Sequence, residues 1–327
     1  MHTPLMEDLL NKKQGTHLNL SGQNDQLYND GSVGYYRIGE GLMSFVFFVF
    51  TNSSYMVGYT YNERRMENIM KHQFSRNELA YGKEGLDALN KKTVMVLGVG
   101  GVGSFAAEAL ARTNIGHIIL IDKDDVDITN VNRQIHALTT TVGQSKVTLM
   151  EERIKLINPE CKVTSLHMFY TDETYEEIFE YDIDYVVDAS DTIMYKIHLM
   201  KECLKRGIKI ISSMGAANKT DPTRFQIADI SKTHTDPMAK VIRTKLRKEK
   251  IYKGIPVVFS DESPIVIRDD VKSYVGNPDA PIRKAQMPPS SNAFVPSVVG
   301  LICASYVVND ILKDFPVTRV KDKQNSN

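Results

Sequence analysis

The sequence predicts an α/β fold in which a mostly parallel sheet carries helices on both of its faces. Short apolar runs rich in Val and Ile alternate with longer segments of helical periodicity between residues 93 and 215. A glycine-rich turn joins the first run to the helix after it, and acidic residues stand where later runs end. Strands that alternate with helices form parallel sheets with right-handed crossovers. The alternation stops near residue 216, which predicts a smaller C-terminal α+β extension.

The glycine-rich turn predicts a nucleotide phosphate site at the start of a Rossmann-like sheet. The apolar run 94–97 leads into a turn and then an Ala-rich helix, and the turn contains Gly98, Gly100, Gly101 and Gly103. Glycines let the backbone approach a phosphate, and the N-terminus of the following helix offers free N–H groups. The next run ends on Asp122, about twenty residues further on, where a carboxylate can accept hydrogen bonds from ribose. Oxidoreductases, methyltransferases and adenylating enzymes all use this arrangement.

Residues beyond Asp122 favour adenylyl transfer over hydride transfer. Asp124 and Asn130 are followed by two cations, Arg133 and Lys146. Hydride transfer needs no clamp on a polyphosphate. Attack on the α-phosphate of ATP, in contrast, builds charge on phosphoryl oxygens that guanidinium and ammonium groups stabilise. Arg133 and Lys146 are therefore candidate catalytic residues.

The stretches GVGGVGS, IDKDDVDITNVNRQ and GQSK together resemble the adenylation core of the ubiquitin-activating-enzyme-like superfamily, which includes adenylating enzymes of the molybdopterin and thiamine pathways. The resemblance implies ATP and Mg²⁺ as ligands. Its implied nucleotide-binding residues are Gly98, Gly100, Gly101, Gly103, Asp122, Asp124, Asn130, Arg133 and Lys146. Its implied catalytic residues are Arg76, Arg133, Lys146 and Asp191.

In this superfamily the second aspartate of the motif that spans residues 188–192 serves the magnesium-bound triphosphate, and the resemblance implies that Asp191 has this role here. Arg76 stands in a short arginine motif, which implies that it reaches the ATP of the other subunit of a homodimer. From the residues alone, Arg76 is equally well explained as a surface arginine on a helix. Asp191, or Asp188 before it, could instead cap the helix that begins near Thr192.

Further elements follow from periodicity and from helix-ending residues. We expect, in order, a helix over 146–157, a strand around 163–168, a solvated helix within 172–181, a strand over 183–187, a helix from near 192 to Gly207 and a strand over 208–212. The strand over 183–187 carries Asp188 and Asp191 at its carboxyl end, where ligands bind in open α/β sheets.

The segment beyond residue 216 predicts a strand near 224–230 and then a basic amphipathic helix. Asp236 and Pro237 provide an N-cap and a first helical residue. Positive charge is concentrated at Lys240, Arg243, Lys245, Arg247, Lys248, Lys250 and Lys253. A basic helical face is most often simply solvated. Here it stands in a chain of zero formal net charge, and such a cluster is what contacts with a phosphate backbone require.

The stretches DPTRFQIADI and DPMAKVIRTKLRK closely resemble one branch of the superfamily, the tRNA threonylcarbamoyladenosine dehydratases. The resemblance implies ATP-dependent cyclisation of threonylcarbamoyladenosine in tRNA by carboxylate adenylation, with AMP and pyrophosphate as the other products. Lys240, Arg243, Arg247 and Lys248 are then expected to bind tRNA. Two alternatives stay open: an adenylating enzyme for a ubiquitin-like sulfur-carrier protein, and an adaptor without chemistry. A monovalent cation and a sulfur-relay or cysteine-desulfurase partner are also left open.

The last apolar segment, SSNAFVPSVVGLICASYVVNDIL, is interpreted as a core helix and not as a membrane span, because it includes Ser305, Asn309 and Asp310. The chain has three cysteines without a Cys-x-x-Cys pair, which predicts a reducing, cytoplasmic location and no cysteine zinc site. Cys303 lies in the apolar segment and is expected to pack and not to react. The zero net charge argues against indiscriminate nucleic-acid binding.

The expected organisation has three parts. Residues 1–69 are polar and rich in Asn, Gly and Tyr, and we interpret them as a poorly ordered or non-native extension, with translation starting at Met66 or Met70. Residues 70–315 form a single adenylating domain, with a nucleotide core over 93–215 and a part for substrate and tRNA over 216–315. Residues 316–327 form a polar tail.

Overall fold

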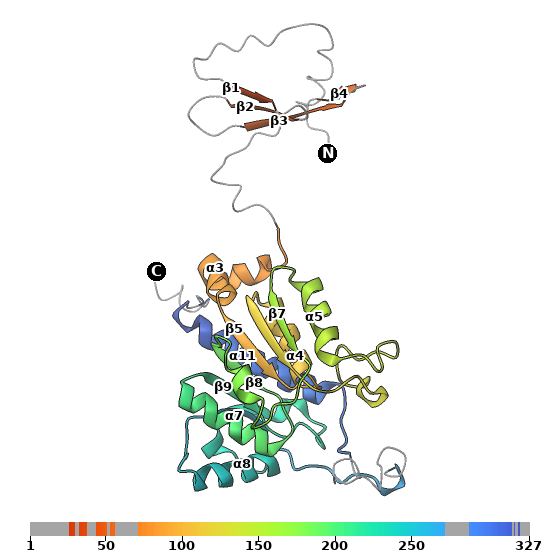
Figure 1. Ribbon diagram of the computed structural model, residues 1–327, viewed down its shortest axis with the longest axis vertical. Helices are drawn as coiled ribbons and strands as arrows, with labels where there is room; N and C mark the ends of the chain where they lie inside the picture. Colours follow the sequence, from red (N-terminus) through yellow and green to blue (C-terminus); the bar gives the residue numbers. More distant parts are fainter. Residues whose placement is uncertain are drawn as a thin grey trace. The chain divides into compact units, whose positions relative to one another are not determined.

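The computed structural model describes the backbone of residues 26–29, 33–37, 44–50 and 53–55, and then residues 71–271, 288–315, 317 and 320 (Figure 1). The chain divides into two compact units, Met1–His72 and Gln73–Asn327. The first unit contains a four-stranded antiparallel sheet of β1 (Gln26–Asn29), β2 (Val33–Arg37), β3 (Ser44–Phe50) and β4 (Ser53–Tyr55). The other residues up to 70, including Met66 and Met70 as proposed starts, lie outside the described residues.

The second unit is built on a seven-stranded sheet with the order β10-β11-β9-β8-β5-β6-β7. Its strands are β5 (Thr93–Leu97), β6 (His117–Ile121), β7 (Lys162–Leu166), β8 (Tyr185–Asp188), β9 (Lys209–Ser213), β10 (Phe225–Asp229) and β11 (Pro256–Ser260). Every neighbouring pair is parallel except β10 with β11. The predicted α/β class with a mostly parallel sheet is therefore confirmed, and the C-terminal extension continues the same sheet.

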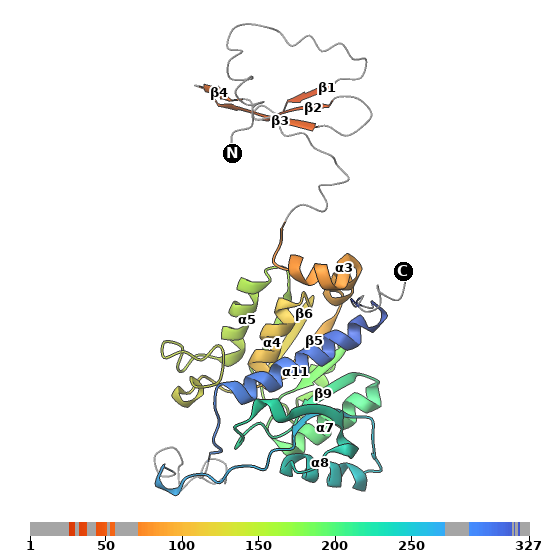
Figure 2. The ribbon, with the colours of Figure 1, turned by 180° about the vertical axis from the view of Figure 1, so that it is seen from behind.

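Helices cover both faces of this sheet. They are α3 (Ser75–Asn90), α4 (Gly103–Arg112), α5 (Lys146–Ile157), α6 (Tyr175–Ile178), α7 (Ile193–Arg206), α8 (Pro237–Lys248) and α11 (Phe294–Ile311). Successive side chains of a strand point to opposite faces. Accordingly, Val94 and Val96 of β5 join a core with α4, α5 and α11, while Met95 and Leu97 join a second core with α7 and α8. Figure 1 shows the side with α7 and α8, and Figure 2 shows α11 crossing in front of the sheet.

The apolar segment near the C-terminus forms α11, the one helix among the described residues that is long and apolar enough to cross a membrane. The structure uses it as a core helix, as predicted, because Val299, Cys303 and Val307 are fully buried. Gly300 lets α11 lie directly on the turn before α4, since a Cβ there would be 2.2 Å from the carbonyl oxygen of Val102. The glycine-rich turn is thus backed by a helix from the far end of the chain.

Candidate nucleotide site

The candidate site lies where the carboxyl ends of β5 and β8 meet. The strand order reverses here, because β5 is followed in space by β6 on one side and by β8 on the other. Ligands of open α/β sheets bind at such a switch point. The two strand ends also touch, since a Cβ on Gly98 would be 2.9 Å from the carbonyl oxygen of Ala189. The glycine turn and the Asp188–Asp191 segment therefore form one continuous edge.

Each glycine of the turn has a separate structural reason. Gly98 has a φ of 85°, in the left-handed region that favours glycine. Gly103 brings α4 close to the strand, because a Cβ there would be 1.8 Å from the carbonyl oxygen of Gly98. Gly101 lies against Pro296 and the aliphatic stem of Arg133. A Cβ on Gly100 would meet only the Gln134 amide, at 3.8 Å, so Gly100 leaves the most room of the four glycines for a ligand.

Asp122 supports the glycine turn directly. One carboxylate oxygen accepts the backbone N–H of Val99 at 2.7 Å, and the other accepts the N–H of Asp124 at 2.9 Å. Asp122 therefore fixes the loop after β5 to the loop after β6. Each carboxylate oxygen has further acceptor capacity, so the predicted contact with ribose stays compatible with these bonds.

Lys146 and Asp124 form a pair beside the turn. Lys146 is the first residue of α5, and only 7% of its side chain is exposed. Its Nζ lies 3.4 Å from a carboxylate oxygen of Asp124, whose other oxygen lies 2.6 Å from Lys123. Burial opposes ionisation of Asp124, but the hydrogen bond from Lys123 and the charge of Lys146 hold the pKa of Asp124 below its usual value. The site thus keeps a buried ammonium group next to an ionised carboxylate.

Arg133 and Asn130 lie on the loop between β6 and α5. The Arg133 guanidinium donates to the carbonyl oxygen of Thr129 at 2.7 Å and to the side chain of Asn132 at 2.9 Å. Burial lowers the pKa of Arg133, and the Asp127 carboxylate opposes that shift. Asn130 is buried and forms a reciprocal capping box with Asp127, so its side chain shapes the loop that carries Arg133.

The segment after β8 separates two aspartates with different environments. Asp188 is fully buried and pairs with Lys196 at 2.9 Å, a lysine that is also fully buried. It accepts further hydrogen bonds from Ser190 and Ser212. Asp191, in contrast, is exposed, and Thr192 is the N-cap of α7. Asp191 is therefore the aspartate of this segment that is accessible to a ligand.

Sequence reasoning missed the Asp188–Lys196 ion pair. A signal was present, because Lys196 stands within the apolar stripe of its helix, one turn after Thr192 and next to the buried Ile197. A lysine on such a stripe is almost never fully buried without a charged partner.

Buried polar atoms in the segment between β6 and α5 test whether a polar ligand fits near the turn. The side-chain oxygens of Gln134 and Ser145, and both ring nitrogens of His136, are buried and make no hydrogen bond within the described part of the chain. Buried polar groups are normally satisfied. Gln134 also lies next to Gly100. The residues present therefore leave buried polar groups unsatisfied near Gly100, which fits a polar ligand at the turn.

The described residues contain no cluster of three or more His, Cys, Asp or Glu that could hold a metal ion by itself. Mg²⁺ at phosphate sites needs only one or two carboxylates, because phosphate oxygens and water complete its shell. An exposed Asp191 at the end of β8 matches that need.

Arg76 lies apart from this edge in the first turn of α3, where its side chain is exposed. Gly82, with a φ of 70°, kinks α3 after this part of the helix. Leu79 on the same part is 89% exposed, so the start of α3 is largely uncovered within one chain.

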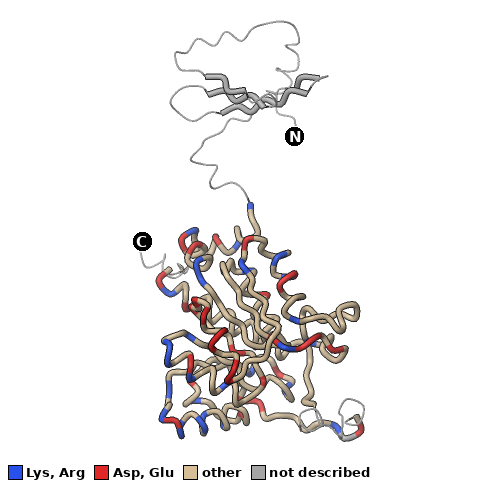
Figure 3. Tube along the Cα trace, in the orientation of Figure 1, with Lys and Arg blue, Asp and Glu red and all other residues tan. Residues whose placement is uncertain are grey.

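The basic helix is α8, as predicted, with Asp236 as its N-cap. Ala239, Ile242 and Leu246 are buried against the sheet, whereas Lys240, Arg247 and Lys248 are exposed. Figure 3 shows where Lys and Arg lie along the backbone. Arg243 is different, because its guanidinium donates to the carbonyl oxygen of Thr233 at 2.7 Å and to the hydroxyl of the same residue. Three of the four predicted tRNA-binding cations therefore point to solvent, and Arg243 also holds the loop before α8.

The three cysteines are free and buried. Burial raises the pKa of Cys303 to about 12 and that of Cys161 to about 11, and it raises the pKa of Cys203 as well. A buried thiol with a raised pKa is a poor nucleophile. The structure thus agrees with the prediction that Cys303 is a packing residue.

Comparisons with known proteins identify the family to which the chain belongs. The ThiF family matches residues 74–326. The tRNA threonylcarbamoyladenosine dehydratase of Bacillus subtilis is 75% identical over 254 residues, which are 78% of this chain and 100% of that protein. The Escherichia coli protein of the same name is 40% identical over 207 residues, covering 61% of this chain and 77% of that one.

Solved structures give the same result. The crystal structure of the E. coli tRNA N6-threonylcarbamoyladenosine dehydratase in complex with AMP has a TM-score of 0.66 and 34% identity, and covers 74% of this chain and 94% of that chain. The ATP complex of the same protein has a TM-score of 0.65 at 34% identity, with the same coverage of both chains. The superfamily resemblance read from the motifs is confirmed, and the chain belongs to the ThiF family.

Proposed function

We propose that this protein is an ATP-dependent tRNA-modifying enzyme that cyclises threonylcarbamoyladenosine in tRNA with net loss of water. The observation that carries the proposal is the 75% identity to the B. subtilis dehydratase over the whole length of that protein. The glycine turn with Arg133 and Lys146 beside it supplies the chemistry that such a reaction requires.

The reaction has two balanced steps. In the first, the carboxylate of the modified nucleoside attacks the α-phosphorus of ATP, a P–O bond forms, and pyrophosphate leaves with the bonding electron pair. In the second, an oxygen or nitrogen of the ureido group attacks the activated carbonyl carbon, the C–O bond to the phosphate breaks, AMP leaves, and the ureido group releases one N–H proton to solvent as the ring closes. The carboxylate oxygen departs in AMP, so the nucleoside loses the elements of one water.

Arg133, Lys146 and Asp191 have distinct roles in the first step. The two cations stabilise the charge that grows on the phosphoryl oxygens, and the near-complete burial of Lys146 strengthens its interaction. Asp191, which is exposed at the carboxyl end of β8, would hold a Mg²⁺ ion, and that ion would neutralise charge on the triphosphate. The glycine turn and the N-terminus of α4 bind phosphate oxygens through backbone N–H groups.

The second step needs little covalent help from the protein. Intramolecular attack has effective molarities of up to roughly 10⁵–10⁸ M, so holding the side chain and excluding water is sufficient to promote ring closure. The buried cysteines match a route without a thioester intermediate. This distinguishes the reaction from transfer to a sulfur-carrier protein through a catalytic cysteine.

Two further parts complete the proposal. The exposed cations of α8, Lys240, Arg247 and Lys248, bind the tRNA backbone, and the enzyme acts in the cytoplasm. The protein is a homodimer in which Arg76 of one subunit reaches the ATP of the other.

The test is incubation of the full chain with ATP, Mg²⁺ and tRNA that carries threonylcarbamoyladenosine, followed by nucleoside mass analysis. We expect the nucleoside to lose the mass of one water and AMP to form in equal amount. Arg133→Ala and Lys146→Ala should each lower kcat by about 10²–10³, the usual effect of removing one charge-stabilising donor. Lys162→Ala, at the opposite end of the sheet on β7, is the control and should leave turnover unchanged.

An unchanged nucleoside with wild-type protein would overturn the proposed function. Full turnover by the Arg133 and Lys146 variants would remove these residues from the mechanism.

A further inference from the structure

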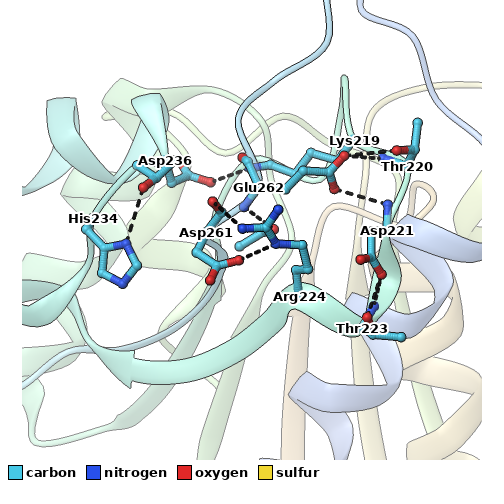
Figure 4. A network of polar contacts seen from close by, with 11 residues as sticks. Lys219, Thr220, Asp221, Thr223, Arg224, His234, Asp236, Asp261 and Glu262 are labelled. Atoms are coloured by element: carbon cyan, nitrogen blue, oxygen red, sulfur yellow. Dashed lines mark hydrogen bonds and ion pairs between the residues drawn. The ribbon is translucent and has the colours of Figure 1, made fainter.

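A buried ion pair lies outside the nucleotide residues, between Lys219 and Asp236 (Figure 4). The Lys219 Nζ is 3.2 Å from a carboxylate oxygen of Asp236 and 3.4 Å from the backbone carbonyl oxygen of Glu262. The two side chains are 1% and 0% exposed. We call Lys219, Asp236 and Glu262 the Lys219 cluster. All three are polar, all three are buried, and none takes part in the mechanism above.

Asp236 both caps α8 and pairs with Lys219. One of its carboxylate oxygens accepts the backbone N–H of Ala239 at 3.0 Å and so caps α8, while the other accepts from Lys219. Lys219 is therefore attached to the first turn of the basic helix. A change at Lys219 acts on α8 through a single carboxylate.

Glu262 holds the same segment from the other side. Its carboxylate accepts the N–H and the hydroxyl of Thr220 at 2.9 and 3.0 Å, and the N–H of Asp221 at 3.0 Å. Although burial opposes ionisation, these backbone donors and the Lys219 charge hold the pKa of Glu262 below its usual value. Residues 219–221 are thus fixed between the end of β11 and the start of α8.

This segment begins at the nucleotide edge. It follows β9, and β9 is the parallel neighbour of β8, which ends at Asp188. A Cβ on Gly215, just after β9, would be 3.6 Å from the carboxylate of Asp236. The cluster therefore lies on the path from the ATP edge of the sheet to α8.

Stability alone does not explain a buried pair of this kind. Removing two charges from water costs several kcal/mol for each ion, and apolar side chains of equal volume often give an equally stable protein. What an ion pair adds is a fixed geometry between the groups that it joins. Here it joins the strand-end segment to the helix that carries the exposed cations.

We infer that Lys219 is a positioning residue, which sets α8 at a fixed place relative to the nucleotide edge so that its exposed cations hold tRNA with the modified base at the ATP. The inference rests on the proposed function. It adds a residue that touches neither ATP nor tRNA and acts through Asp236.

The other end of α8 offers a matched control. Glu249, just after the helix, pairs with Lys201 of α7 at 2.7 Å, with side chains 48% and 35% exposed. Exposed pairs contribute little because solvent screens them. Lys201→Met therefore removes an ion pair of the same helix without removing a buried charge.

The experiment compares wild type, Lys219→Met, Lys219→Arg and Lys201→Met as full chains. It measures the tRNA dissociation constant by fluorescence anisotropy and the ATP dissociation constant by calorimetry, and neither readout depends on turnover. We expect Lys219→Met to weaken tRNA binding on the order of tenfold, as expected for lost phosphate contacts. ATP binding should change less than about twofold, Lys219→Arg should recover most tRNA affinity, and Lys201→Met should resemble wild type.

Equal weakening of ATP and tRNA binding, or wild-type tRNA binding by folded Lys219→Met, would overturn the inference. If Lys219→Met does not fold, Lys219→Met/Asp236→Asn removes the unpaired buried carboxylate, and the same tRNA-specific loss is expected from it. Wild-type protein that binds tRNA and ATP but leaves the nucleoside unchanged would contradict the proposed function and not the positioning role.

Discussion

The substitution Gly98→Ala tests whether the positive φ of Gly98 and its close contact with Ala189 require a glycine in the nucleotide turn. Gly98 has a φ of 85°, where an alanine costs about 1–2 kcal/mol because its Cβ approaches the following carbonyl. The added Cβ would also lie 2.9 Å from the carbonyl oxygen and 3.0 Å from the carbonyl carbon of Ala189. These are backbone atoms, so they cannot rotate away, and overpacking of this kind costs typically about 1–3 kcal/mol. Together these two costs should lower the free energy of unfolding of Gly98→Ala by roughly 2–5 kcal/mol.

Gly143→Ala is the control for this experiment. Gly143 has nearly the same φ, 84°, but a Cβ there meets no described atom within 4 Å. It should therefore cost only the conformational part, about 1–2 kcal/mol. The chain has no tryptophan, so urea unfolding followed by circular dichroism is the suitable assay. Equal losses for both variants would refute the reasoning, because the contact with Ala189 would then carry no cost.

Two further predictions concern pH and assembly. Burial, with smaller effects of the Lys146 and Arg153 charges, lowers the pKa of His136 from 6.5 to about 4, so the unfolded chain binds this proton at a higher pH than the folded one. The free energy of unfolding should therefore fall as the pH drops from 6.5 toward 4, and His136 should contribute on the order of 3 kcal/mol of that loss. The urea midpoint of His136→Gln should drop less between pH 7 and pH 5 than that of the wild type. Equal drops would contradict a role of buried, neutral His136 in this pH dependence. If Arg76 serves the partner subunit, inactive Arg76→Ala and Lys146→Ala proteins should regain about a quarter of wild-type turnover after subunit exchange, since half the dimers are mixed and have one intact site. No recovery in exchanged dimers would place Arg76 in its own subunit's site or outside the mechanism.

Local periodicity and turn chemistry were sufficient to predict most of the fold. The run expected at 94–97, the run expected to end at Asp122, the helix over 146–157 and the helix end at Gly207 match β5, β6, α5 and α7, because each depends on a short stretch of chain. The solvated helix expected within 172–181 is shorter, spanning Tyr175–Ile178, and it buries Ile178. β11 was not predicted, although Pro256–Ser260 is an apolar run, because its place between β9 and β10 depends on the whole sheet.

The hydrogen bonds of the site residues could not be predicted from the sequence, because they join residues that are distant along the chain. The motif predicted that Asp122 contacts ribose, but the hydrogen bonds that Asp122 accepts from Val99 and Asp124 form only when the loops after β5 and β6 meet. Helical spacing likewise put Arg243 on a basic face, yet its bonds to Thr233 depend on the turn before α8. The Lys219 cluster joins residues 17 and 43 positions apart, which no periodicity relates.

The packing of α11 on the turn before α4 has a consequence for how the protein is made. The helix that backs the glycine turn begins about 190 residues after α4 begins. At about 5–20 residues per second, a ribosome needs roughly 10–40 s to add that stretch. During this interval the apolar faces of Ala106 and Leu110, which α11 later covers, belong to an incomplete core. The nascent nucleotide-binding half therefore exposes apolar side chains to solvent until α11 has been synthesised and packs against α4.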